Sequence, residues 1–257
     1  MSVDDIFENS PKIVNINITC QTGSSLTITN NITTDPLRSN LNSNTNIYLT
    51  QDITVETTTA YGYIGTAFTI SAVTNLVIDG EGYKLTFASA NYANGRFFEI
   101  SGASTVSMLN LELVNGRIYL DCDDDASVVY GGSISVLGSS TLTMTYCAIR
   151  ESFAYAGCHT TAYGGALCVY SGTANLNYCE FTDNLAADSN SGYGGAIAVF
   201  NGAFCYTTGC YFADNTATGG SSYGIDVYIA GTFTASGCAI TDGSLQTNSG
   251  VYSNYVC

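Results

Sequence analysis

Acidic side chains recur at one place in a repeated phrase, and carboxylates are the groups that could bind a hard cation. Each lies two residues after a large apolar residue; the four are Glu151, Asp183, Asp214 and Asp242. If the phrases stack about 4.8 Å apart, neighbouring carboxylates repel unless they project into water, accept backbone N–H bonds or share Ca²⁺. The pattern therefore leaves two interpretations open, a solvated turn-capping edge and a cation ladder.

A second acidic cluster is the segment "DCDDD" at residues 121–125, which we expect to be a loop. Its carboxylates belong to Asp121, Asp123, Asp124 and Asp125. They could chelate Ca²⁺, although no glycine and glutamate spacing like that of an EF-hand accompanies them. A solvated acidic loop is the alternative, and Ca²⁺ is the only cofactor that the sequence suggests.

Cysteine recurs at an equivalent place in successive phrases, at Cys147, Cys179, Cys210 and Cys238. The chain has 10 cysteines, no CxxC pair and 1 histidine, which is unlike a zinc protein and typical of a secreted one. Cysteines on adjacent rungs lie within the Cα separation that a disulfide tolerates. We predict disulfides in this rung, with free buried thiols as the alternative and the connectivity left open.

Catalytic chemistry has little support in the sequence. His159 adjoins Cys158, but adjacency alone does not create a nucleophile and base geometry. Polysaccharide-cleaving enzymes need a base or paired carboxylates and groups that hold the sugar. The basic residues that could do so are scattered, at Lys84, Arg96, Arg117 and Arg150. We predict that the protein is not an enzyme, and keep a polysaccharide-cleaving enzyme as the alternative.

Charge and composition restrict the partners and the compartment. The 257 residues include 21 Asp and Glu against 6 Lys and Arg, and the net charge of −15 disfavours nucleic acid and anionic membranes. The acidic start lacks the pattern of a signal peptide, so either a leader is absent from this numbering or export is unconventional. Asn17 and Asn31 begin glycosylation sequons. We expect an extracellular or cell-surface glycoprotein that does not insert into a membrane.

These side chains are positioned by a repeat whose units begin at Tyr130, Tyr163, Tyr193 and Tyr223, with separations of 33, 30 and 30 residues. Within each unit apolar residues alternate, which predicts short strands separated by glycine turns. One unit has room for about three strands and cannot bury an apolar face alone, so units must stack. The sequence predicts an all-β, single-stranded, right-handed parallel β-helix of about eight coils with a period of about 30 residues.

The predicted helix spans residues 13–257, after a cap or arm at 1–12. Its clearest repeats are 130–162, 163–192, 193–222 and 223–257. Asn184 and Asn215 fall at equivalent turns, where stacked amides form a structural ladder. The tyrosines at the Tyr-Gly corners either pack the corners or present a ring stack to a glycan or a protein.

Two phrases resemble known families. "GGAL" with "FTDN", and "GGAI" with "FADN", resemble the GGA[ILV] and FxxN repeats of the polymorphic outer-membrane protein family over residues 163–217. "LVIDGEGYKL" is similar to strand and turn phrases of pectin-lyase-like right-handed β-helices. The first resemblance implies a secreted or surface-exposed β-helix, as in adhesins and autotransporter passengers.

The predicted function is that of an extracellular structural or adhesive β-helix. The open ends of a β-helix need covering, so subunits could stack head to tail into a surface filament. A glycan-binding adhesin passenger and a polysaccharide-cleaving enzyme are alternatives, and ice binding is a third. "TLTMT" suggests a threonine row for ice, but the next coil reads "ANLNY" and interrupts it. The expected partners are other copies of the chain, or a cell-surface or glycan ligand.

Overall fold

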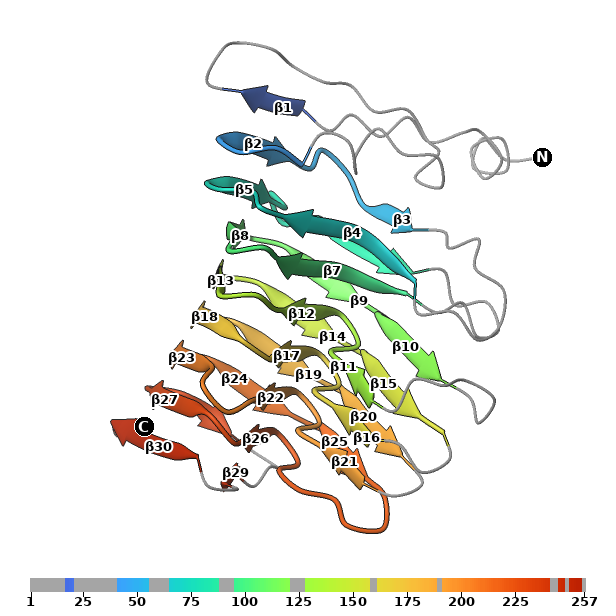
Figure 1. The fold of residues 1–257 in the computed structure, drawn as a ribbon. Helices are drawn as coiled ribbons and strands as arrows, with labels where there is room; N and C mark the ends of the chain where they lie inside the picture. Colours follow the sequence, from blue (N-terminus) through green and yellow to red (C-terminus); the bar gives the residue numbers. More distant parts are fainter. Residues whose placement is uncertain are drawn as a thin grey trace, which may run out of the picture.

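The chain forms an all-β parallel solenoid (Figure 1). The computed structural model describes residues 17–20, 41–55, 65–87, 95–120, 128–157, 161–188, 191–240, 245–247 and 250–255. About five turns with a period of about 31 residues follow one another along the stack, where the sequence predicts about eight coils of about 30 residues. The predicted cap or arm at 1–12 lies outside the described residues.

Sheet A is the longest wall of the solenoid and has 9 strands. In spatial order they are β1 (Asn17–Cys20), β2 (Thr45–Tyr48), β5 (Leu76–Asp79), β8 (Thr105–Leu109), β13 (Ser140–Thr145), β18 (Gly172–Asn177), β23 (Phe204–Thr208), β27 (Thr232–Ser236) and β30 (Val251–Tyr255). Only β1 is antiparallel to its neighbour, and it pairs with β2 at one end of the sheet. The other eight strands, from β2 to β30, are parallel.

Sheets B and C complete the main tube, with 7 strands each. Sheet B comprises β3 (Ile53–Val55), β6 (Lys84–Phe87), β9 (Glu112–Val114), β14 (Ala148–Arg150), β19 (Glu180–Thr182), β24 (Tyr211–Ala213) and β28 (Ala239–Ile240). Sheet C comprises β4 (Thr66–Ser71), β7 (Arg96–Ser101), β12 (Ile134–Val136), β17 (Leu167–Val169), β22 (Ile197–Val199), β26 (Val227–Ile229) and β29 (Leu245–Thr247).

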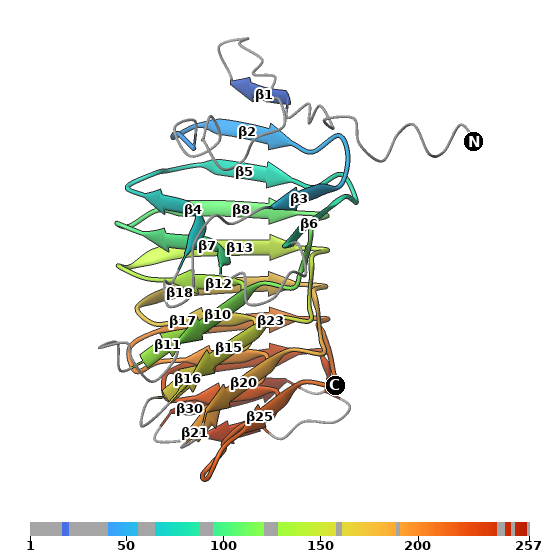
Figure 2. The ribbon, with the colours of Figure 1, turned by 90° about the vertical axis from the view of Figure 1, so that its right-hand side faces the viewer.

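Two smaller sheets lie beside this tube in the C-terminal half (Figure 2). Sheet D comprises β10 (Arg117–Leu120), β15 (Phe153–Ala156), β20 (Leu185–Asp188) and β25 (Thr216–Thr218). Sheet E comprises β11 (Val128–Tyr130), β16 (Thr161–Tyr163) and β21 (Ser191–Tyr193). The middle coils therefore contain strands from five sheets, two more than the three that the repeat length predicts.

In-register pairing explains why the sequence repeats. Ile134 pairs with Leu167, which pairs with Ile197, so each coil places the same kind of side chain above its neighbour. Alternate residues point into the tube, where Phe181 stacks on Phe212 with ring centroids 5.1 Å apart. Burying one such side chain contributes about 1.5–3 kcal/mol. A second, smaller core between sheets D and E includes Ile118.

The Tyr-Gly-Gly phrase makes the corner between sheets E and C. Gly164 and Gly194 adopt φ values of 66° and 67°, in the left-handed region that favours glycine. A Cβ atom on Gly165 would overlap the carbonyl oxygen of Gly195 in the next coil. Glycine recurs at this corner because adjacent coils approach too closely for a side chain.

Candidate adhesive surface

The predicted acidic column lies at the corner between sheets B and D. Glu151, Asp183 and Asp214 are exposed and adopt φ values of 54°, 57° and 55°. The N–H groups of Glu151 and Asp183 each donate to a carbonyl of the next coil at 3.2 Å. Within the described ranges, no three His, Cys, Asp or Glu side chains are grouped so that they could hold a metal ion. The cation ladder therefore stays a prediction, with Asp242 outside the described residues.

Several other predicted site residues fall where the structure gives no description of their side chains. They are Asn17, whose backbone alone is described in β1, together with Asn31, Asp121, Asp123, Asp124, Asp125, Cys158 and His159. The glycosylation sites, the second acidic cluster and the Cys158–His159 pair thus stay predictions.

Asn184 and Asn215 form a buried hydrogen-bonded ladder. The Nδ2 of Asn184 donates to Oδ1 of Asn215 at 2.9 Å, and the same oxygen accepts the backbone N–H of Asn184 at 3.1 Å. The amide of Asn215 also donates to the carbonyl of Phe181 at 2.9 Å and to Asp226 at 2.8 Å. Oδ1 of Asn184 accepts the N–H of Ser152 at 3.0 Å, so the amides connect three coils.

The predicted disulfides in the cysteine rung are absent from the structure. Cys147, Cys179, Cys210 and Cys238 are buried free thiols, as are Cys168 and Cys205. In-register neighbours point the same way at about the rung spacing of 4.8 Å, far beyond a sulfur–sulfur bond of about 2.05 Å. The sulfurs of the rung instead contact the next coil, where the N–H of Cys179 lies 3.4 Å from Sγ of Cys210. This rung packs as a column of small apolar side chains.

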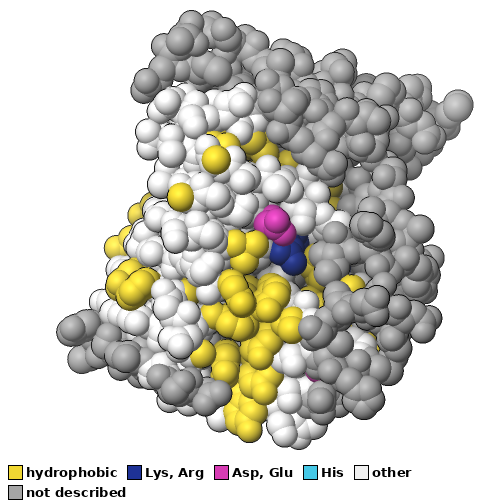
Figure 3. All heavy atoms as spheres, viewed as in Figure 1, with side chains coloured by type: hydrophobic (Ala, Val, Ile, Leu, Met, Phe, Trp, Pro, Cys, Tyr) yellow, Lys and Arg dark blue, Asp and Glu magenta, His cyan; other side chains and the backbone are white. Residues whose placement is uncertain are grey.

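The tyrosines of the Tyr-Gly corners form a continuous stack, which we call the tyrosine ladder. It consists of Tyr130, Tyr163, Tyr193 and Tyr223, with successive ring centroids 6.0, 4.8 and 5.4 Å apart. Phe200 packs edge-on against Tyr163 at 4.6 Å. Figure 3 shows hydrophobic side chains gathered over the area where Figure 1 places β12, β17 and β22. The ladder covers the outer side of sheet C, so its rings pack a corner and are also partly exposed.

Burial changes the ionisation of groups in the tyrosine ladder and beneath it. Cys168 lies on the outer side of β17, where burial raises the pKa of its thiol. Burial also raises the pKa of Tyr130 and of Tyr163 to about 12. Arg96 is 4% exposed, and its Nη1 contacts Glu99 at 3.3 Å and donates to Ser135. These groups pack against one another on the outer side of sheet C.

The outer face of sheet A is uncharged over five consecutive strands, and we call it the neutral face. On β8, β13, β18, β23 and β27, none of the described outward side chains is Asp, Glu, Lys or Arg, although the chain carries −15 overall. Hydroxyl and amide groups in register dominate it. The outward residues are Thr105, Ser107, Leu109, Thr141, Thr143, Thr145, Thr173, Asn175, Asn177, Phe204, Tyr206, Thr208, Thr232, Thr234 and Ser236.

Two exposed aromatic pairs accompany the neutral face. Phe204 and Tyr206 lie on β23, each 42% exposed, with centroids 6.4 Å apart. Tyr146 and Tyr178, which we call the corner pair, stack at 5.3 Å at the corner between sheets A and B and are 62% and 55% exposed. Both adopt left-handed backbone conformations, with φ of 54° and 53°. That conformation costs an L-residue about 1–2 kcal/mol, and exposed rings recover little of it.

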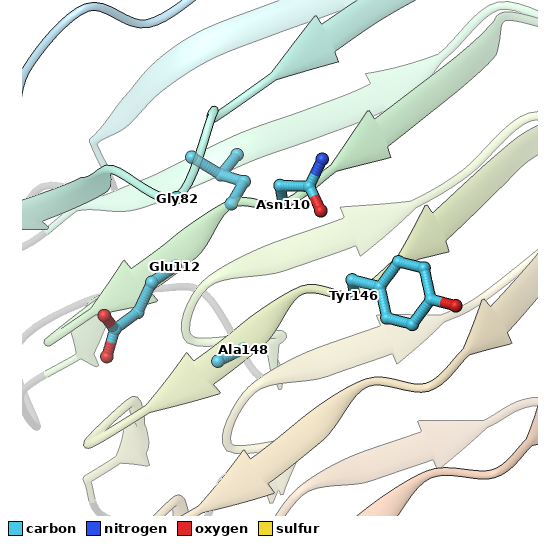
Figure 4. Close-up of a pocket in the computed structure, with 6 residues that line it drawn as sticks. Gly82, Asn110, Glu112, Tyr146 and Ala148 are labelled. Carbon is cyan, nitrogen blue, oxygen red and sulfur yellow. The ribbon is translucent and has the colours of Figure 1, made fainter.

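A pocket of about 210 Å³, the corner pocket, adjoins Tyr146 (Figure 4). It is lined by Gly82, Asn110, Leu111, Glu112, Tyr146 and Ala148. Glu112 and Tyr146 lie at opposite sides of it. Nearby, Arg150 bridges two carboxylates, with Nε 3.0 Å from Glu112 and Nη2 2.6 Å from Glu180.

Sequence reasoning missed the neutral face and the corner pair for identifiable reasons. In a threonine row Asn175 and Asn177 are interruptions, whereas on the folded surface they continue an uncharged set of hydrogen-bonding groups. The corner pair did leave a signal. The residue before the rung cysteine is Tyr146 or Tyr178 in two coils and glycine in the next two, which indicates a left-handed turn occupied by a bulky residue.

Comparison with known families adds one finding. Residues 38–133 match a family model described as "Putative pectate lyase-like adhesive domain". The match covers the coils from β2 to β11 and agrees with the β-solenoid fold and with an adhesive role. Neither the search of curated proteins nor the search of solved structures found a match. In the described residues, no helix is long and apolar enough to cross a membrane.

Proposed function

We propose that this chain is an extracellular adhesive β-solenoid whose adhesive surface is the neutral face of sheet A. The observation that carries the proposal is the absence of charge from the described outward side chains of β8 to β27, in a chain with a net charge of −15. The match of residues 38–133 to an adhesive domain supports the same role.

The physical reason is the low cost of covering this face. Carboxylates are expensive to desolvate and repel the anionic surfaces of cells. Hydroxyl and amide groups can exchange water for partner hydrogen bonds at little net cost, and exposed rings add apolar area. The face is also rigid, because every strand in it pairs on both sides. A rigid uncharged surface suits repeated weak contacts with an extended partner.

We propose that the chain has no catalytic activity of its own. Glu112 is the carboxylate that lines the corner pocket, and Arg150 pairs with it and with Glu180. Assays for newly formed sugar ends on neutral and acidic polysaccharides, with and without Ca²⁺, test this; sustained release would contradict it.

Finer features of the chain are part of the proposal. We expect right-handed winding, because right-handed crossovers between parallel strands of one sheet predominate. Relation to the polymorphic outer-membrane protein repeats is supported by Phe181, Asp183 and Asn184 of "FTDN", which occupy the core, the turn and the ladder. Surface exposure follows from an adhesive role.

Head-to-tail association is a second candidate. Among the described strands, β28, β29 and β30 are the last of sheets B, C and A, and each pairs on one side only. Such edges accept further strands. Electron microscopy at several concentrations, with and without a Ca²⁺ chelator, should show filaments; monomeric particles throughout would contradict them. Dissociation by the chelator would place the acidic column in the contact.

The adhesive proposal is tested with protein-coated beads under flow over films of cellulose, chitin, polygalacturonate and collagen. Thr143→Asp and Asn175→Asp place charge on the neutral face, and Thr54→Asp places the same charge on sheet B as the matched control. We expect the first two variants to lower bead retention at least tenfold and the control to match wild type. Equal retention of all three variants would contradict the proposal, as would a wild type that no film retains.

A further inference from the structure

We propose that the corner pair and the corner pocket together bind a neutral pyranose sugar, the terminal or internal unit of an uncharged glycan. The inference rests on the proposed adhesive function and names its ligand class. It assigns a specific subsite to the edge of the neutral face, where Tyr146 and Tyr178 directly follow the last outward residues of β13 and β18.

The corner pair is a built feature of the surface. Tyr146 and Tyr178 stack at 5.3 Å with an angle of 16° between their ring planes. The coil below makes room for them, since a Cβ atom on Gly209 would lie 2.6 Å from Cδ1 of Tyr178. Two large side chains in left-handed conformations, with most of their ring area in solvent, contribute little to folding. The next two coils place Gly209 and Gly237 at this corner, where glycine adopts the left-handed conformation without strain.

The pocket beside Tyr146 contains two side chains with hydrogen-bond acceptor oxygens, a carboxylate and an amide. Glu112 carries a carboxylate whose Oε1 lies 3.0 Å from Nε of Arg150. Asn110 carries an amide whose Nδ2 donates to Asp79 at 3.3 Å, which leaves its oxygen as an acceptor. Ala148 occupies the place between Glu112 and Glu180 in register, and its short side chain leaves the space open. The pocket is therefore bordered by acceptor groups and, on the side opposite Glu112, by the ring of Tyr146.

The ligand class follows from this combination. A pyranose has an apolar C–H face that packs on an aromatic ring and hydroxyl groups that donate to carboxylate and amide oxygens. Anions are disfavoured because Glu112 lines the site and the chain carries −15. A cation would have to compete with Arg150 for the same carboxylates. At about 210 Å³ the pocket takes one ring and not a drug-sized molecule.

The experiment is calorimetric titration of the whole chain with tetrasaccharides of glucose, mannose, N-acetylglucosamine and galacturonate. Tyr146→Ala and Tyr178→Ala remove ring area, and Tyr146→Phe keeps the ring. The matched control is Tyr211→Ala, which removes another exposed ring from sheet B outside the pocket. We expect at least one neutral tetrasaccharide to bind. The two alanine variants should weaken binding at least tenfold, whereas Tyr146→Phe and Tyr211→Ala should stay within threefold of wild type.

The proposal is overturned if no neutral tetrasaccharide binds, if galacturonate binds in preference, or if Tyr146→Ala and Tyr178→Ala bind as wild type. Circular dichroism of each variant shows whether the fold is intact, and Glu112→Gln provides an independent test that leaves both rings in place. Glu112→Gln should also weaken binding. Bead retention that depends on Thr143 and Asn175 without any sugar binding would overturn this inference and leave the adhesive function standing.

Discussion

Removal of one amide from the asparagine ladder should destabilise the solenoid strongly. In Asn215→Ala four hydrogen bonds are lost, two donated by Nδ2 to Phe181 and Asp226 and two accepted by Oδ1 from Asn184. Asn215 is 2% exposed, so water does not readily replace it. At about 1 kcal/mol for each bond, the free energy of unfolding should fall by about 3–5 kcal/mol. That is a large part of the 5–15 kcal/mol typical of a folded domain.

The assay is equilibrium unfolding in urea followed by far-ultraviolet circular dichroism. The matched control is Asn175→Ala, which removes the same amide from the half-buried outer side of β18. We expect the control to change the free energy by less than about 0.5 kcal/mol, as is usual for surface substitutions. A loss below about 1 kcal/mol in Asn215→Ala, with an unchanged denaturant slope, would show that the ladder is not a main support of the fold.

Three further predictions concern the corners, the tyrosine ladder and the thiols. Gly165→Ala should lower the free energy of unfolding by about 3 kcal/mol, because its Cβ would overlap Gly195. Gly202→Ala should lower it by only about 1 kcal/mol, because a Cβ there meets open space and only the φ of 81° is unfavourable. Thermal unfolding of the two variants measures the difference. Since burial raises the pKa of Tyr130 and Tyr163 to about 12, the folded state holds these protons where the unfolded chain has lost them. Stability should therefore fall as pH rises from about 10 to about 12, and the fall should shrink when both are changed to Phe; an unchanged alkaline profile would count against the assignment. The six buried thiols should resist a thiol reagent in the folded protein and react after unfolding; thiols that fail to react after unfolding would indicate disulfides. They are Cys147, Cys168, Cys179, Cys205, Cys210 and Cys238.

The stacked architecture was predictable because a solenoid repeats its sequence. Asn184 and Asn215 could be recognised as a ladder from two residues at one turn, since in-register stacking places one amide beside the other. The disulfide prediction was wrong because Cα spacing alone does not orient a side chain. Parallel in-register strands keep neighbouring sulfurs pointing the same way.

Features that depend on backbone conformation or on long loops were harder to predict. The only sequence signal for Tyr146 and Tyr178 is that later coils have glycine at the same turn. Glycine there indicates a left-handed backbone, but it does not indicate that the rings are exposed. Sheets D and E lie on segments of varied length, such as 117–130, where the period is least regular. The neutral face is defined by the absence of charge at all outward positions of five strands together. A single row of threonines does not indicate it.

The parallel stack also determines how the protein would respond to a pulling force. Neighbouring coils are joined by backbone hydrogen bonds along the axis, and Figure 1 shows β1 and β30 at opposite ends of the stack. A load between those ends would peel one coil at a time, and each coil of about 31 residues would release about 100 Å of chain. In the proposed adhesive role, a cell pulled by flow would unfold one coil after another. The coils that stay folded would keep the neutral face in contact with the partner surface.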